Sequence, residues 1–163
     1  MSPNKIEIPK SVRTEHDAIH DTLKEATRTT GRVGPAAQEL ARVLHPHFVR
    51  EEEIALPPLG LLSRLASGDI TADMADVLSM TDALRRELPQ MLEEHKAIRA
   101  AVENLRVAAR ADNAEKYERL ANDLALHAQT EEELLYPAAI LVGDVIRARL
   151  RSATQHTIGH NSD

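Results

Sequence analysis

Histidines and glutamates recur along the chain at spacings that suit metal binding. Two glutamates each follow a histidine by four residues, and two further histidines interrupt apolar helical patterns; the set is His16, His47, Glu51, His95, His127 and Glu131. Residues four apart on a helix share one face and differ by about 6 Å along its axis. Each His-x-x-x-Glu pair therefore presents an imidazole and a carboxylate together, which is the chemistry of a metal site.

These residues belong to a sequence repeat. The segment EHDAI at residues 15–19 returns as EHKAI at 94–98, and the pattern of residues 47–57, which ends in proline, returns at 127–137. The histidines of the first half are centred on a glycine-rich turn near residue 31, and those of the second half on residue 111. In two antiparallel hairpins, over 11–57 and 89–137, both pairs of histidines therefore lie at the same height.

Helices are the elements that must position this set. The chain has one Phe, two Tyr and no Trp, and such scarcity of aromatic residues disfavours strands. Apolar residues spaced three and four apart predict four helices, over Val12–Ala26, Ala37–Ile54, Leu84–Ala109 and Tyr117–Pro137. We expect Ser11 to cap the first helix, and Pro46 and Pro89 to kink the second and third.

The remaining segments are a connector, a short helix and a tail. The connector spans about 59–80, the short helix runs from Ala138 to Leu150, and a disordered, flexible tail covers 151–163. The prediction is an all-α protein whose residues 1–150 form a single domain, built as an up-down-up-down antiparallel four-helix bundle.

Composition excludes several classes of partner and site. The net charge of -6 argues against nucleic-acid and anionic-membrane binding, and no apolar run approaches the roughly 20 residues of a membrane span. The first ten residues lack a signal-peptide core, so we expect a cytoplasmic protein, and the sequence specifies no oligomeric state. With no cysteine, disulfides, iron–sulfur clusters and thiolate zinc sites are excluded, and any metal has nitrogen and oxygen ligands.

Stacking the two hairpins brings four histidines and two glutamates to one point of the bundle core. Two buried, unpaired carboxylates would each cost several kcal/mol, and a bound cation removes that cost. Iron, manganese and zinc all suit imidazole and carboxylate ligands. Carboxylates contributed by two opposed helices favour a dinuclear site.

The repeated His, His-x-x-x-Glu pattern resembles the hemerythrin-like family, also called the HHE cation-binding domain, over residues 11–137. The resemblance implies an oxo- or hydroxo-bridged, non-haem di-iron centre. In it His16 and His47 would bind one iron, His95 and His127 the other, and Glu51 and Glu131 would bridge them.

A fifth histidine distinguishes the oxygen-carrying members of this family, one turn after the histidine of the third helix. Here that position is Arg99, and the repeat places His20 at the equivalent point of the first helix. We therefore infer that His20 is a further ligand, which gives one iron three histidines and the other two. A position left open would bind dioxygen, peroxide or nitric oxide.

This site favours reversible binding or sensing over enzymatic turnover. The ligand would be dioxygen, a reactive oxygen or nitrogen species, or iron itself. The alternatives are an enzyme that consumes peroxide or nitric oxide, a metallohydrolase that uses His16-x-x-x-His20, and a purely structural metal. Ferritin-like centres use Glu-x-x-His motifs, which do not occur at the level of the histidines.

The residues next to the predicted ligands are interpreted as surface or packing residues. We expect a solvated surface for Glu52, Glu53, Glu132 and Glu133, with hydrogen bonding to an imidazole as the alternative. Tyr136 could shield the site or form a hydrogen bond near it, but we interpret it as a packing residue because the repeat places Leu56 at its equivalent position. His45 lies about 160° around the helix from His47 and should point away.

Overall fold

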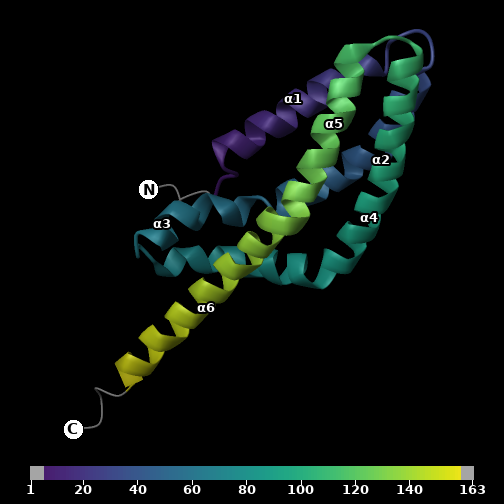
Figure 1. Cartoon of the computed structure of the whole chain (residues 1–163). Helices are drawn as coiled ribbons and strands as arrows, with labels where there is room; N and C mark the ends of the chain where they lie inside the picture. The colour runs from purple at the N-terminus through teal and green to yellow at the C-terminus, as the bar shows by residue number, and fades with distance from the viewer. Residues whose placement is uncertain (1–5, 159–163) are drawn as a thin grey trace.

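The computed structural model describes residues 6–158, and the side chains of residues 6–155. Four long helices form the bundle, α1 (Lys10–Ala26), α2 (Val33–Ile54), α4 (Leu78–Ala111) and α5 (Glu115–Thr130). Figure 1 shows α5 continuing into a fifth long helix, α6 (Tyr136–Ile158), by way of a π-helical turn, η3 (Glu131–Leu135). No strand occurs in residues 6–158, which confirms the predicted all-α four-helix bundle.

The connector between the two hairpins is mostly helical. It contains η1 (Pro57–Leu61), α3 (Leu62–Ala66) and η2 (Ala72–Val77), and leads directly into α4. None of the helices in the described part of the chain is long and apolar enough to cross a membrane.

Asp112, in the turn of the second hairpin, caps the N-terminus of α2, the second helix of the first hairpin. No residue of the first turn caps α2 with its side chain. Instead, the Asp112 carboxylate accepts hydrogen bonds from the backbone N–H groups of Arg32 at 2.6 Å and Val33 at 3.0 Å. A carboxylate at a helix N-terminus satisfies free N–H groups and complements the helix dipole. This contact joins the two hairpins at the end of the bundle where their turns meet.

Two bundle helices each contain a proline. Pro46 lies inside α2, which continues to Ile54. Pro89 lies inside α4, and Figure 1 shows α4 bending strongly between its first part and the rest. Because proline lacks an N–H and crowds the preceding turn, it accounts for this bend. The predicted serine cap is wrong, because α1 begins at Lys10 and Ser11 lies within it.

The helix α6 extends past the expected boundary at Leu150 and reaches Ile158. Val142 and Ile146 anchor it, packing in a cluster with Met74 and Val77 of η2. The remainder of the predicted tail, 159–163, lies outside the described residues.

Close packing of α6 on α4 requires a glycine at position 143. A Cβ atom there would lie 2.2 Å from Oγ1 and 2.7 Å from Cβ of the buried Thr81. We expect Gly143→Ala to lower the free energy of unfolding by about 1–3 kcal/mol, measured by urea denaturation. Adding Thr81→Ala should recover part of that loss. Stabilisation by about 1 kcal/mol, the gain that alanine gives in an unhindered helix, would contradict the prediction.

Candidate metal centre

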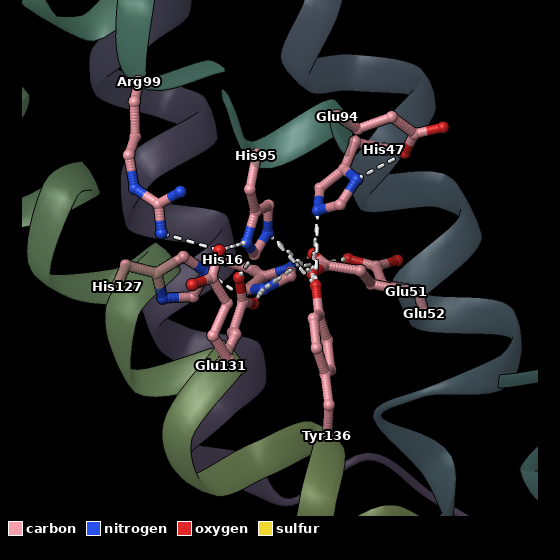
Figure 2. Close-up of polar contacts among 11 residues, drawn as sticks. His16, His47, Glu51, Glu52, Glu94, His95, Arg99, His127, Glu131 and Tyr136 are labelled. Carbon is pink, nitrogen blue, oxygen red and sulfur yellow. Dashed lines mark hydrogen bonds and ion pairs between the residues drawn. The ribbon is translucent and has the colours of Figure 1, made fainter. Parts of the chain in front are cut away.

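Six of the seven predicted ligands converge inside the bundle. Each has a side chain at most 3% exposed, although four of the six are histidines and two are glutamates. Figure 2 shows them pointing toward one another from different helices; they are His16 of α1, His47 and Glu51 of α2, His95 of α4, His127 of α5 and Glu131 of η3.

Two overlapping groups of donors make up the cluster. In each group the ligand atoms lie within 4.8 Å of one another; one is His16, Glu51, His127 and Glu131, and the other is His47, Glu51, His95 and Glu131. Both glutamates belong to both groups, as expected of residues that join two metals.

The pairing of histidines differs from the expected one. His16 lies with His127, at 4.9 Å between ring centroids, and His47 lies with His95 at 4.6 Å. We expected each hairpin to supply both histidines of one metal. Each pair instead spans the two hairpins, because His16 and His127 lie on α1 and α5, and His47 and His95 lie on α2 and α4.

A five-residue backbone hydrogen bond occurs at both shared glutamates; at Glu51 it stands beside an ordinary helical bond from Ala55, also 2.9 Å long. The Glu51 carbonyl accepts a hydrogen bond from the N–H of Leu56 at 2.9 Å, and the Glu131 carbonyl accepts one from Tyr136, five residues on in each case. A proline, Pro57 or Pro137, follows each donor. Because proline cannot continue the normal ladder, it favours these five-residue turns, which are frequent at functional sites.

Several buried polar atoms of the cluster make no hydrogen bond of good geometry within the described part of the chain. They are His16 Nε2, Glu51 Oε2, His127 Nε2 and both carboxylate oxygens of Glu131. Buried polar atoms are rarely left this way, since each costs about 1–3 kcal/mol. Nitrogen and oxygen atoms that face one another without hydrogen bonds of good geometry between them fit a transition-metal ion.

Each imidazole turns its other nitrogen to a carboxylate from a neighbouring element. The Nδ1 to carboxylate-oxygen distances are 3.4 Å for His16 and Glu52, 2.7 Å for His47 and Glu94, 2.8 Å for His95 and Glu132, and 3.1 Å for His127 and Glu15. A carboxylate on Nδ1–H leaves Nε2 free to bind a metal and orients the ring.

These contacts favour the alternative interpretation of Glu52 and Glu132, which orient imidazoles. Sequence reasoning missed Glu15 and Glu94. The signal was present, because both directly precede a histidine in the two copies of the repeat.

The structure does not bring His20 to the cluster. Its side chain is 56% exposed and lies beside His45, with 6.2 Å between ring centroids. Phe48 occupies this side of the cluster and stacks on His16 at 4.1 Å. The expectation of a seventh ligand and of a three-to-two division of histidines is corrected accordingly. At the equivalent position Arg99 donates to Glu132 at 2.6 Å.

Tyr136 is the residue whose role sequence reasoning misjudged. It is fully buried, and its hydroxyl donates a hydrogen bond to Glu51. The same oxygen lies 3.3 Å from His47 Nε2 and 3.2 Å from His95 Nε2 (Figure 2). Tyr136 therefore faces one of the two donor groups, while its repeat equivalent, Leu56, has no polar atom in its side chain.

Burial and ion pairing set the protonation of the cluster. Burial lowers the pKa of His47 and of His127, but contacts with Glu51 and Glu131, respectively, outweigh it and raise each pKa to about 9. Burial and the charge of Glu131 raise the pKa of Glu51. Burial also opposes ionisation of Glu131, yet three histidines hold the pKa of Glu131 well below its usual value.

The metal-free protein should lose stability as pH rises from about 6.5 to about 9. The ordinary histidine pKa is 6.5, whereas His47 and His127 reach about 9 when folded. The folded state therefore binds protons more tightly, so its ion pairs stabilise fully below pH 6.5 and are lost through pH 9.

Urea unfolding at a series of pH values, with a chelator present, measures this loss. Metal loading should reverse the trend, because metal ions compete with protons for the same imidazoles and bind better at higher pH. Metal-free protein that gains stability across this range would contradict the assignment.

Comparison with protein families gives one finding. The family model described as "Hemerythrin HHE cation binding domain" matches residues 7–139, and again residues 86–156. No curated protein and no solved structure matches the chain significantly. The first match spans most of the chain and includes all six clustered residues. The chain belongs to the hemerythrin HHE cation-binding domain family.

Proposed function

We propose that this protein holds two non-haem iron ions and reversibly binds or senses a small ligand, namely dioxygen, peroxide or nitric oxide. The observation that carries the proposal is the pair of donor groups that share Glu51 and Glu131. Each group supplies four donor residues, fewer than the roughly six positions of an octahedral metal. Positions therefore remain for a bridging oxygen species and for an exogenous ligand.

The donor set admits iron, manganese and zinc, and iron is the metal that membership of the hemerythrin family implies. The set contains four neutral imidazoles and two carboxylates, so the metals would carry less anionic charge than in carboxylate-rich centres. When bound, two irons supply Lewis acidity and a redox couple to a small ligand. The low anionic charge favours reversible binding or sensing over demanding oxidation.

A buried tyrosine hydroxyl lies beside the donors. Burial and the charge of Glu51 raise the pKa of Tyr136, which keeps its hydroxyl protonated. Tyr136 then serves as a hydrogen-bond donor in a water-poor core. Steady consumption of peroxide or nitric oxide by the iron-loaded protein would overturn this preference and favour an enzyme.

Metal analysis and optical spectroscopy test the proposal together. Protein purified without added metal should contain two irons per chain, matching the two donor groups. Its charge-transfer bands should change when azide or peroxide is added, because an open position accepts the anion. Two irons with an inert spectrum would indicate a closed, structural metal site, and zinc alone would contradict redox sensing.

A further inference from the structure

A second cavity lies between α1 and α2, outside the metal centre. It has a volume of about 270 Å³, and its walls include the buried apolar side chains of Leu23, Leu44 and Phe48. Drug-sized ligands occupy pockets of roughly 300–1,000 Å³. This cavity therefore suits a smaller molecule with an apolar body.

All the ionisable side chains that line the cavity are basic. They are His20, Lys24 and His45, all of them exposed, and Lys24 makes no ion pair with any residue of the described chain. One acidic group is near, since Asp21 lies 4.0 Å from His20, but it does not line the cavity.

This charge pattern is unusual for the protein. The chain carries a net charge of -6, and the neighbouring grooves contain carboxylates. Glu15 and Asp123 line the groove between α1 and α5 together with Lys116 and Arg119, and Glu87 and Glu94 line the groove between α2 and α4 together with Arg42 and Arg50. The lining of the α1–α2 cavity thus contains no carboxylate, and Lys24 offers an anion a positive charge at its rim.

We propose that the α1–α2 cavity binds a small monocarboxylate with an apolar body. The body packs against Leu23, Leu44 and Phe48, and the carboxylate lies at the rim beside Lys24 and the two histidines. A ligand with both parts fits better than an inorganic anion, which leaves the apolar wall uncovered. A neutral hydrocarbon leaves the basic rim without a counter-charge.

The cavity also contacts the metal centre. Phe48 forms part of its wall and stacks on His16 with 4.1 Å between ring centroids and 16° between ring planes. The apolar body of a bound monocarboxylate therefore touches Phe48, which supports one of the clustered imidazoles. The proposal does not depend on which metal the centre holds.

Calorimetric titration of the purified protein with benzoate tests the proposal. We expect saturable binding, and binding of benzyl alcohol, which has the same ring without the charge, about tenfold weaker or more. Lys24→Glu should weaken benzoate binding by about tenfold or more, because it places a like charge at the rim. Lys96→Glu makes the same change of charge on α4, away from the cavity, and should bind benzoate as the unmodified protein does.

A second variant separates this cavity from the metal as the binding site. Ala41 lines the cavity, so Ala41→Phe should fill it and abolish benzoate binding, while metal content and circular dichroism stay unchanged. Benzoate binding that survives both Lys24→Glu and Ala41→Phe would place the ligand elsewhere and overturn the proposal. If the protein contains no iron and Lys24→Glu still weakens benzoate binding, the cavity proposal stands and only the proposed di-iron function is refuted.

Discussion

Replacing Glu131 by alanine is expected to abolish the binding of both metal ions. Glu131 belongs to both donor groups, and its carboxylate lies 2.9 Å from His127 Nε2 and 3.5 Å from both His16 Nε2 and His95 Nε2. Without this anion, four imidazoles face a single carboxylate. Loss of a residue that only orients a ligand already costs about 10–100-fold in affinity, so loss of a shared ligand should cost more. Metal analysis after desalting should fall from two ions per chain to nearly none.

Two other substitutions serve as controls for the Glu131→Ala result. His127 belongs to one donor group only, so His127→Ala should lose one metal and keep the other. Glu133 is an exposed neighbour in the same π-helical turn, and Glu133→Ala should keep both. Circular dichroism verifies that each variant retains its helices. If Glu131→Ala and His127→Ala each lose one metal, Glu131 is not shared between two ions.

The height of the six donors was predictable, but their pairing was not. Helical periodicity and the repeat place each histidine at one level and on an inward face, because both depend only on spacing along the chain. Pairing depends on how the side chains are directed between the packed helices, which spacing along the chain does not determine. Helix α1 contacts both α2 and α5, and His16 lies beside His127 rather than beside His47.

The error at His20 has a related cause. A residue four positions after a ligand differs from it by about 40° around the helix, which leaves it at the edge of the inward face. Whether an edge residue turns inward depends on what fills the space beside it. Phe48, from another helix, stacks on His16 there, and His20 remains at the surface.

The misjudgement of Tyr136 shows the limit of reasoning by repeat. Leu56 and Tyr136 occupy equivalent positions, both fully buried, and each follows its bridging glutamate by five residues. Their backbone settings agree, as the repeat indicates. The phenol is longer than leucine and carries a hydroxyl, so Tyr136 reaches Glu51 of the other hairpin. Equivalent positions in the repeat therefore make different contacts.

Substitution of Tyr136 should destabilise the metal-free protein strongly. Tyr136→Phe removes the donor to the buried Glu51 carboxylate and should lower the free energy of unfolding by about 1–3 kcal/mol. Tyr136→Ala also leaves a cavity in the core and should cost about 3–5 kcal/mol. Urea denaturation with a chelator present measures both losses.

The other tyrosine of the chain provides the matched control. Tyr117 donates to the exposed Glu25 at 3.3 Å, so Tyr117→Phe removes a hydroxyl whose acceptor water can replace, and should cost about 0.5 kcal/mol or less. Equal losses for Tyr136→Phe and Tyr117→Phe would mean that the buried hydroxyl adds nothing to stability. Tyr136 would then act as its equivalent Leu56 does, by packing alone, and the hydrogen bond to Glu51 would not distinguish the two donor groups.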